Sequence, residues 1–469
     1  MRNITSFVCQ ECGYDSPQWL GRCPECGVWN SLREIRNPIP IKSGRNLGAT
    51  RDKATQIELT PKTLTEIKSS EKERLSTGFS EMDGVLGGGI VKGSVILLAG
   101  DPGIGKSTLL LQIALNMARS AGVVGRSSNS HVLYVSGEES QEQIKLRAKR
   151  LYNKNIKNSN LLIFSSTNTD AAILAIVKVA SDATKAPQSG GKAKPLLVII
   201  DSIQTMESEN MAGLSGSVGQ VRYAASQFIK LAKTLNIPII IVGHVTKEGM
   251  VAGPMVLSHM VDTVLFLEGE KFTKTRILRS LKNRFGSVDE VGVFTMEEAG
   301  IEQIKNPQHL FLTKNANKDS YGSVLVITLE GTRAFLVEVQ GLVVSSRLPM
   351  PRRVATGIDY KRLELLLAVL QKHCKLPLGT MDVFVNIAGG LKLSDPAADL
   401  GICLAIFSSF KNISLSNTVA ISEVGLLGEL RSVASLDKRI KEAQKLGFKN
   451  IISHNTHKTL SDVIRSLAK

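Results

Sequence analysis

The chain has 469 residues, of which 43% are hydrophobic and 5% aromatic, so it is too long for one ordinary domain and apolar enough to build several cores. Its formal net charge of +16 favours a polyanionic partner, most simply nucleic acid, although an ordinary basic cytosolic protein has a similar balance. No run of about 18 apolar residues occurs, so we predict no membrane span. The amino terminus lacks the apolar core of a signal peptide, and we expect a cytoplasmic protein.

Four cysteines near the amino terminus form two pairs with the spacing of a metal site. Cys9 and Cys12 make the first pair, and Cys23 and Cys26 follow after a spacer of ten residues. Four thiolates at this spacing suit tetrahedral Zn²⁺, and because protein would fill every ligand position we expect a structural site. Two disulfides are the alternative, which a cytoplasmic chain disfavours. The sequence therefore predicts a four-cysteine zinc module over residues 1–30, held together mostly by its metal.

The tryptophans of the chain, Trp19 and Trp29, lie in or beside this module. Their rings could stack on bases or on another protein, but we favour a role in the small core of the module.

Residues 31–70 are rich in proline, glycine, lysine, serine and threonine and lack apolar periodicity. This composition is typical of a linker.

A phosphate-binding loop is the most specific motif of the chain. An apolar run over residues 95–99 predicts a buried strand, and another over residues 109–115 predicts a helix. Between them every position of the G-x-x-x-x-G-K-[ST] motif is met by Gly100, Asp101, Pro102, Gly103, Ile104, Gly105, Lys106 and Ser107, followed by Thr108. Backbone N–H groups of such a loop cradle phosphates, the lysine reaches the β- and γ-phosphates, and the serine hydroxyl binds Mg²⁺. We therefore expect the chain to bind a nucleoside triphosphate.

Continuous apolar runs that alternate with helix-like segments follow the loop, at residues 131–136, 196–200, 237–243 and 261–267. This alternation predicts an α/β domain with a doubly wound, mostly parallel sheet over residues 71–300. Ligands of such sheets bind beyond the carboxyl ends of the strands. The polar residues that follow the first three runs are therefore site candidates, namely Glu138, Glu139, Asp201 and His244.

The position of each candidate suggests a role. Asp201 follows four apolar residues, as the acid of a Walker-B strand does, and would hold Mg²⁺ directly or through water. A carboxylate after the neighbouring strand can polarise the attacking water, and we favour Glu138 while keeping Glu139 as the alternative. Either glutamate could instead be a helix N-terminal acid. His244 would sense the γ-phosphate through a hydrogen bond or be an ordinary strand-end histidine.

A basic segment, Lys282-Asn283-Arg284-Phe285-Gly286, closes this domain after a strand-like run. Two cations at positions i and i+2 of an extended segment point to the same side. We expect Lys282 and Arg284 to reach a γ-phosphate bound by the next subunit, as an arginine finger does. A solvated basic turn is the alternative.

From about residue 310 the pattern changes to that of an α+β domain, over residues 310–469. A hairpin is predicted over residues 322–339, followed by helices at 360–373, 396–407 and 436–446 and strands at 382–387 and 419–430. Cys374 and Cys403 lie in apolar, helix-like surroundings, so we expect them to be buried rather than reactive.

These motifs together, and above all Lys-Asn-Arg-Phe-Gly, resemble the bacterial RadA (Sms) family of DNA-repair ATPases. The resemblance covers nearly the whole chain. It implies a RecA-like P-loop NTPase core that forms a hexameric ring with ATP between subunits, where Lys282 and Arg284 act in trans. It implies further that the protein is a DNA-dependent ATPase of recombinational DNA repair, which binds single-stranded DNA, drives branch migration of branched DNA and works beside a RecA-type recombinase.

RecA-like cores carry DNA-facing loops after the Walker-B strand and after the sensor strand. The matching segments are residues 206–222 and 246–257, both rich in Gly, Ser and Met, with Arg222 and Lys247 as the expected phosphate contacts. Contacts to the DNA backbone predict weak sequence preference and strong salt dependence. A signalling ATPase that never touches DNA is an alternative, against which the zinc module and the positive charge weigh.

The carboxy-terminal domain resembles the Lon protease fold, whose peptidase activity needs a Ser–Lys dyad. Ala397 stands at the nucleophile position and Asp437 at the lysine position, so we expect no peptidase activity. An ATP-dependent protease or protease-like regulator is the alternative function, and it would need Ser394 or Lys438 to substitute. We expect the domain to support ring assembly and to offer DNA a basic surface from Arg347, Arg352, Arg353, Lys361, Arg362, Arg431, Lys438, Arg439 and Lys441.

Overall fold

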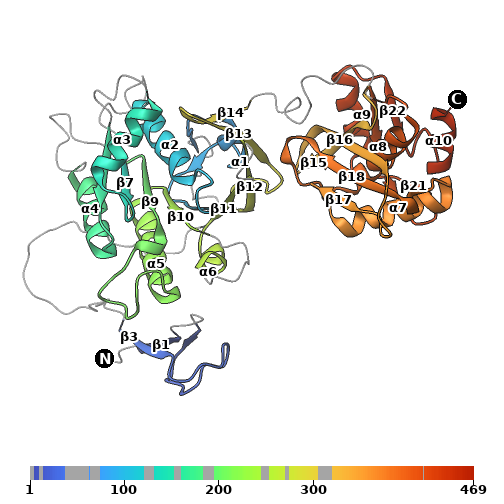
Figure 1. Ribbon diagram of the computed structural model, residues 1–469. Helices are drawn as coiled ribbons and strands as arrows, with labels where there is room; N and C mark the ends of the chain where they lie inside the picture. The colour runs from blue at the N-terminus through green and yellow to red at the C-terminus, as the bar shows by residue number, and fades with distance from the viewer. Residues whose placement is uncertain are drawn as a thin grey trace, which may run out of the picture. The chain divides into compact units, whose positions relative to one another are not determined.

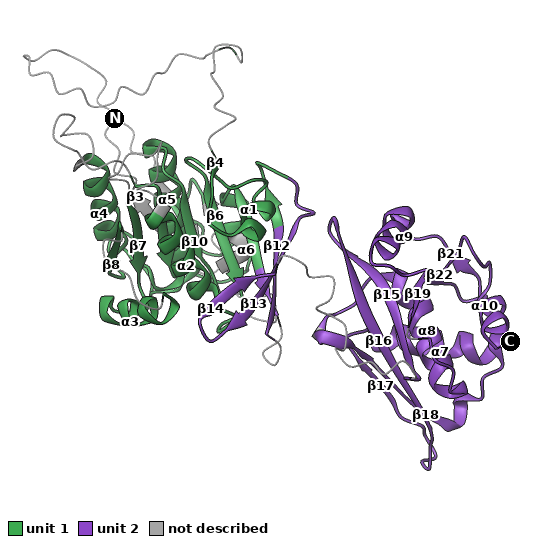
Figure 2. Cartoon of the chain, turned by 90° about the horizontal axis from the view of Figure 1, so that it is seen from above, with its two compact units in different colours: residues 1–266, 281–286 green, residues 267–280, 287–469 purple. Residues whose placement is uncertain are grey.

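The computed structural model describes residues 5–9, 14–36, 63, 74–120, 131–152, 160–182, 195–244, 253–269, 274–304, 320–415 and 417–468 (Figure 1). The chain divides into two compact units (Figure 2). The first unit comprises Met1–Phe266 and Leu281–Gly286, and the second comprises Leu267–Ser280 and Ser287–Lys469. Every helix among the described residues is too short or too polar to span a bilayer.

The amino-terminal module is a three-stranded antiparallel sheet. Its strands, in the order β2-β1-β3, are β1 (Thr5–Cys9), β2 (Asp15–Ser16) and β3 (Leu32–Arg36). Because β3 pairs with the whole of β1, the folded module extends into the segment where the sequence predicts a linker. Leu32 explains the extension, since its buried side chain packs with Cys9 and Cys23. Apart from Thr63, the rest of the predicted linker lies outside the described residues.

A nine-stranded sheet, in the order β14-β13-β12-β11-β6-β10-β9-β7-β8, forms the middle of the chain. The run β6-β10-β9-β7-β8 is parallel, whereas β12, β13 and β14 pair antiparallel, which confirms the mostly parallel sheet expected from the sequence. The strands are β6 (Val95–Gly100), β7 (Val132–Ser136), β8 (Leu161–Ser165), β9 (Leu197–Asp201), β10 (Ile239–Val242), β11 (Thr263–Glu268), β12 (Thr275–Asn283), β13 (Val291–Glu297) and β14 (Gly300–Gln303).

Helices cover both faces of this sheet, which explains why β6, β7, β9 and β10 are buried at every position. α4 and α5 pack on one face in a common core with alternate strand residues, and α2 packs on the other face against β6, β7 and β9. The helices of this region are α1 (Ser80–Val85), α2 (Lys106–Ser120), α3 (Gln141–Leu151), α4 (Thr169–Asp182), α5 (Val218–Leu235) and α6 (Gly253–Met260). Before β6, the short strands β4 (Arg74–Leu75) and β5 (Ile90–Val91), which flank α1 in the sequence, pair antiparallel.

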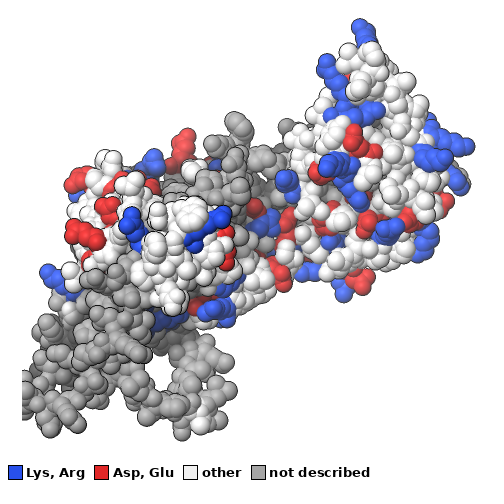
Figure 3. All heavy atoms as spheres, turned by 90° about the horizontal axis from the view of Figure 1, so that it is seen from below, with Lys and Arg blue, Asp and Glu red and all other residues white. Residues whose placement is uncertain are grey.

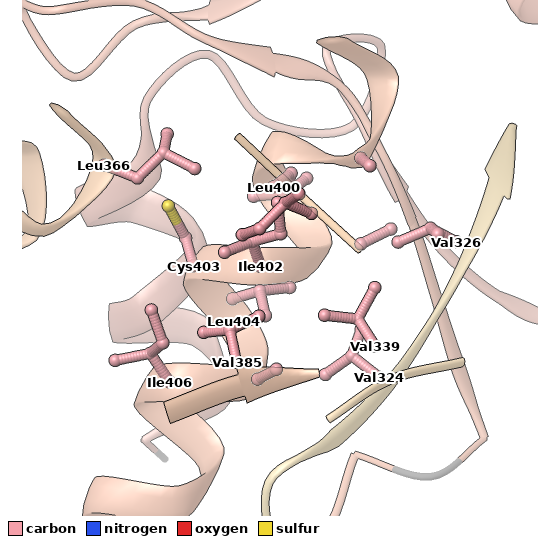
Figure 4. Close-up of a cluster of buried hydrophobic side chains, with 14 of the residues drawn as sticks. Val324, Val326, Val339, Leu366, Val385, Leu400, Ile402, Cys403, Leu404 and Ile406 are labelled. Atoms are coloured by element: carbon pink, nitrogen blue, oxygen red, sulfur yellow. The ribbon is translucent and has the colours of Figure 1, made fainter. Parts of the chain in front are cut away.

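The second unit has a six-stranded sheet in the order β17-β18-β16-β15-β19-β22. Its apolar residues pack against α7 and α8 in one core, where Cys403 lies among Leu366, Leu400 and Ile402 (Figure 4). The strands are β15 (Ser323–Glu330), β16 (Arg333–Ser345), β17 (Arg353–Thr356), β18 (Met381–Ile387), β19 (Thr418–Ile421) and β22 (Asn450–Ser453). The helices are α7 (Tyr360–Cys374), α8 (Asp399–Lys411), α9 (Leu436–Lys445) and α10 (Leu460–Leu467).

The hairpin and the helices predicted for this region are present as β15–β16, α7, α8 and α9. The single stretch predicted as strand after residue 419 is divided among β19, β20 (Glu423–Val424) and β21 (Leu430–Arg431). A turn closed by the bond from the Gly428 N–H to the Gly425 carbonyl separates β20 from β21. Burial raises the pKa of Cys374 to about 11 and raises the pKa of Cys403 well above its ordinary value, so both thiols stay protonated and poorly reactive.

The unit boundary falls before the point where the sequence pattern changes. β13 contributes Val291 and Val293 to the core of the second unit, and the Thr332 N–H donates to the Asp289 carbonyl at 2.7 Å. The edge of the nine-stranded sheet is therefore also part of the second unit. This double role was not visible in the sequence, where residues up to about 300 read as one α/β pattern.

Candidate active site

The phosphate-binding loop lies between the carboxyl end of β6 and the start of α2. Gly103 and Gly105 adopt φ angles of +78° and +112°, which side chains other than glycine rarely tolerate. The buried Lys106 ammonium donates to the carbonyl oxygens of Gly100 at 2.8 Å and Asp101 at 3.0 Å. Burial lowers the pKa of Lys106 below its ordinary value. The loop thus combines a desolvated cation with a helix N-terminus, the arrangement that binds phosphate.

The strand order brings the sequence-predicted polar residues together. β10, which ends just before His244, lies between β6 and β9, and β7 lies on the other side of β9. His244 Nδ1 is 3.2 Å from Lys106 Nζ, and His244 Nε2 is 3.2 Å from Glu138 Oε1. The Ser202 hydroxyl donates to the same glutamate oxygen at 2.5 Å. A hydrogen-bonded chain therefore runs from the lysine of the loop to the glutamate that follows β7.

Glu138 and Glu139 are adjacent in sequence but have different partners. The hydrogen bond with His244, aided by Ser202, lowers the pKa of Glu138 to about 2, so this carboxylate is ionised at neutral pH. Glu139 pairs with Arg147 of α3 at 2.7 Å, and burial raises its pKa. Of these two glutamates, it is Glu138 that joins the chain of groups reaching Lys106.

Asp201 lies at the end of β9 and is 4% exposed. Its Oδ2 accepts a hydrogen bond from the hydroxyl of Tyr134 on β7, whereas its buried Oδ1 has no partner among the described residues. A buried carboxylate oxygen without a donor is costly unless a ligand binds there. Such an oxygen fits a hard divalent cation such as Mg²⁺, for which Asp201 and the half-buried Ser107 are the expected protein ligands.

Sequence reasoning missed two residues of this site, Ser202 and Tyr134. Ser202 directly follows Asp201, so its adjacency to the Walker-B acid was the available signal. Tyr134 is the one hydroxyl-bearing aromatic in β7, and a fully buried tyrosine hydroxyl needs an acceptor. The distance between the two strands, which no sequence pattern gives, identifies Asp201 as that acceptor.

Arg284 lies at the opposite end of β6 from the phosphate-binding loop. Its guanidinium is 3.4 Å from the Asp262 carboxylate, and Asp262 exchanges hydrogen bonds with Val95, the first residue of β6. At about 3.3 Å per residue, the length of β6 separates Arg284 from the loop by roughly 17 Å. Arg74 holds the segment in place by donating to the Phe285 carbonyl at 2.6 Å. The Arg284 side chain is 59% exposed.

Three cysteines of the amino-terminal module form a compact thiol cluster. The Sγ atoms of Cys9, Cys23 and Cys26 lie within 4.8 Å of one another, whereas Cys12 lies outside the described residues. Gly27 has a φ of +72°, and its N–H donates to the Cys23 carbonyl at 2.9 Å, which turns the chain after the second pair. Clustered thiolates of this kind suit zinc.

The tryptophans do not form the core of this module, so that expectation was wrong. Trp19 is 55% exposed and Trp29 is 70% exposed. Cys9, Cys23 and Leu32 form the core instead, with Phe7, Tyr14 and Leu20 packed against them. The Arg22 guanidinium lies 5.9 Å from the centroid of the Trp29 ring, so this indole is covered in part by a cation.

The first of the two predicted DNA-facing loops is held in place by Gln220. This side chain is 2% exposed, accepts a bond from Ser208 N at 2.9 Å and donates to the Met211 carbonyl at 2.5 Å. Arg222, the expected phosphate contact, is partly buried on α5. Lys247 and most of the second predicted loop lie outside the described residues.

The carboxy-terminal domain has no nucleophile at the position where the Lon resemblance places one. Ala397 is fully buried before α8, and Asp437 is exposed on α9. An ion pair occupies this region, in which Asp395 accepts from Arg439 at 2.6 Å and from the Ala397 N–H at 3.0 Å. Although burial opposes it, the Arg439 hydrogen bond lowers the pKa of Asp395. Lys438, which is exposed, donates a hydrogen bond to the Thr332 carbonyl.

Several of the basic residues expected on a DNA-facing surface have partners within the chain. Arg439 is 2% exposed and donates to the Ile327 carbonyl at 2.7 Å, so the expectation that it faces DNA was wrong. Arg362 pairs with Asp399, and Arg431 pairs with Glu429. On the face shown in Figure 3, the Lys and Arg side chains of this unit form several groups with Asp and Glu between them.

Comparison with known proteins identifies families, individual proteins and a solved structure to which this chain is similar. The AAA domain family matches residues 60–250, and a family described as rubredoxin metal binding domain matches residues 7–34. The DNA repair protein RadA of Bacillus subtilis is 45% identical over 449 residues, and that of Halalkalibacterium halodurans is 44% identical over 449 residues; each alignment covers 96% of this chain and 92% of the relative. The RadA protein of Listeria monocytogenes is 43% identical with the same coverage. A crystal structure of the RadB recombinase aligns with 49% of this chain and 100% of that chain, at 23% identity and a TM-score of 0.36.

Proposed function

The chain belongs to the RadA family of DNA repair proteins, and from this premise we propose that it is a ring-forming, DNA-dependent ATPase that processes recombination intermediates. The observation that supports this most strongly is the hydrogen-bonded chain from Lys106 through His244 to Glu138, beside the carboxylate of Asp201. These residues bring a phosphate ligand, a sensor, a general base and a metal ligand to one edge of one sheet.

Glu138 is our choice for the base that activates water. Its carboxylate is ionised at neutral pH and is oriented by Ser202 and His244, so it can take a proton from water attacking the γ-phosphate. Lys106 would turn from its carbonyl partners to the β- and γ-phosphates of ATP. Bound Mg²⁺ would supply positive charge to those phosphates, with Ser107 and Asp201 as its protein ligands. His244 would detect the γ-phosphate because it lies between Lys106 and Glu138.

Arg284 supports an assembly in which ATP lies between subunits. It is exposed and lies the length of a strand away from its own phosphate-binding loop, so a nucleotide within its reach would belong to another chain. There it would stabilise charge on the transferred phosphoryl group. A closed ring satisfies this head-to-tail contact in every subunit, and we propose a hexamer.

Single-stranded and branched DNA are the partners we propose, with a RecA-type recombinase as a protein partner. The net charge of +16 supports a DNA-facing channel, as does the first loop, whose Ser208 and Met211 backbone groups bond to the Gln220 side chain. Contacts there would be made mainly to phosphates, so hydrolysis would be coupled to movement along DNA of any sequence.

Subunit mixing tests the proposal. Lys106→Ala should lose ATP turnover, and Arg284→Ala should lose turnover while it still binds ATP. A mixture of the two variants should regain part of the activity, because an intact loop can meet an intact arginine at some interfaces. The double variant Lys106→Ala/Arg284→Ala is the matched control. When it is mixed with either single variant, ATP turnover should not recover. If the mixture of Lys106→Ala and Arg284→Ala regains no activity, Arg284 does not act in trans. If single-stranded DNA does not raise ATP turnover at low salt, the ATPase is not DNA-dependent.

A further inference from the structure

The two cations of the basic segment are held very differently. The Lys282 ammonium lies 2.8 Å from the Ser258 carbonyl, 3.3 Å from the His259 carbonyl and 2.8 Å from the Val261 carbonyl. Ser258 and His259 belong to the last turn of α6, and Val261 follows just after the helix. The carbonyls at the end of an α-helix have no partner within the helix and carry the negative end of its dipole. Lys282 is therefore a cap for the carboxyl end of α6.

The Arg284 side chain, two residues further along the chain, is held less firmly than that of Lys282. Its contact with the Asp262 carboxylate is long, at 3.4 Å. That carboxylate is also held by the Lys233 ammonium at 2.6 Å and by the Val95 N–H at 3.0 Å, so it keeps two donors when Arg284 leaves. Departure of Lys282, in contrast, removes a cation from three carbonyls at once.

We propose that the Lys282 ammonium alternates between the end of α6 and a phosphate oxygen of the nucleotide held by the neighbouring subunit. The inference rests on the proposed action of the basic segment across a subunit interface. An ammonium is a compact charge with three donors, so it cannot serve three helix carbonyls and a phosphate together. A phosphate oxygen carries a full negative charge and attracts the ammonium more strongly than neutral carbonyls do. ATP arriving in one subunit would thus uncap α6 of the next.

Hydrogen exchange in the nucleotide-free protein tests the cap by itself. Lys282→Met keeps the length and apolar stem of the side chain but removes the charge, so the amides of residues 257–262 should exchange at least about tenfold faster than in the unmodified protein. Arg284→Met is the matched control and should leave these amides unchanged, and Lys282→Arg should restore part of the protection. Unchanged amides of α5 show that the variant is folded. Equal exchange of residues 257–262 in Lys282→Met and the unmodified protein would overturn the proposal.

A non-hydrolysable ATP analogue tests the alternation. In the unmodified full-length protein the analogue should speed exchange at residues 257–262, whereas in Lys282→Met it should add nothing to exchange that is already fast. Lys106→Ala, if a direct binding measurement shows that it does not take up the analogue, should show no change. If the analogue leaves α6 of the unmodified protein protected while the mixture of Arg284→Ala and Lys106→Ala regains turnover, the switch is wrong although action in trans holds. If that mixture fails as well, the proposed function fails at its own test.

Discussion

The hydrogen bond with His244, and then the one with Ser202, lower the pKa of Glu138 to about 2. A lowered pKa means that the charge is present above a pH of about 2 and is lost only as the pH falls through that value. Glu138→Gln should therefore reduce ATP turnover by about 10²- to 10⁴-fold, and the ratio of the two activities should stay constant between about pH 5 and pH 8. Turnover and nucleotide binding measured across this range check the expectation.

Glu139→Gln is the matched control for that substitution. It alters the pair with Arg147 and not the chain that reaches Lys106, so turnover should fall several-fold at most. A large loss in Glu139→Gln with a small loss in Glu138→Gln would reverse the assignment. If the ratio of unmodified to Glu138→Gln turnover becomes smaller as the pH falls from 8 to 6, the base that activates water has a higher pKa than Glu138 has in this structure.

Tyr134 acts on the site through Asp201. Removing its hydroxyl in Tyr134→Phe leaves the buried carboxylate oxygen without its donor and loosens the orientation of a proposed metal ligand. Partners of this kind typically change metal affinity by about 10- to 100-fold, so the Mg²⁺ concentration for half-maximal turnover should rise by a factor in that range. Tyr152→Phe, which removes a hydroxyl bonded to Asn116, is the control and should leave the Mg²⁺ dependence unchanged. An unchanged Mg²⁺ dependence in Tyr134→Phe would separate the tyrosine from metal binding.

At the scale of elements, one ion pair ties α9 to the rest of the second unit. Arg439 reaches Asp395 before α8 and the Ile327 carbonyl of β15, all from a buried position. Arg439→Met leaves the Asp395 carboxylate without its cation and should lower the free energy of unfolding of this unit by about 3–5 kcal/mol in denaturant titrations. Arg465→Met, at an exposed pair on α10, should change it by less than about 0.5 kcal/mol. If Arg439→Met has the same free energy of unfolding as the unmodified protein, the ion pair between Arg439 and Asp395 does not stabilise this unit.

The zinc module is an element that we expect to depend on its metal. Its described core consists of Cys9, Cys23 and Leu32 with a few partly buried neighbours, which is too little apolar surface to hold three short strands. A strong chelator should release zinc and make the amides of residues 14–36 exchange freely, while DNA-independent ATP turnover stays within about twofold. Metal analysis and hydrogen exchange give the readout. Protein that contains no zinc as purified, or protection that survives chelation, would contradict the expectation.

Elements differ in how far their sequences predict them. β6, β7, β9 and β10 are buried on both faces, so they appear as unbroken apolar runs, and the polar residue after each run is a site candidate without further information. β3 has only Leu32 and Ile35 as apolar residues, so its pattern resembles that of the linker. The choice between Glu138 and Glu139 depends on which side chain turns toward β9 and β10, and that is decided by Ser202, His244 and Arg147 rather than by spacing.

Across the whole molecule the excess positive charge should make DNA binding strongly dependent on salt. If a ring channel contacts phosphates through many Lys and Arg side chains, each contact releases counterions, so the logarithm of the affinity falls linearly with the logarithm of the salt concentration. Six to ten such contacts predict a loss of about 10³- to 10⁵-fold between about 50 and 200 mM salt, measured with labelled single-stranded oligonucleotides of several sequences. The slope should be the same for every sequence, because a phosphate-contacting channel does not read bases. A flat response, or slopes that differ between sequences, would replace this picture with recognition of base edges.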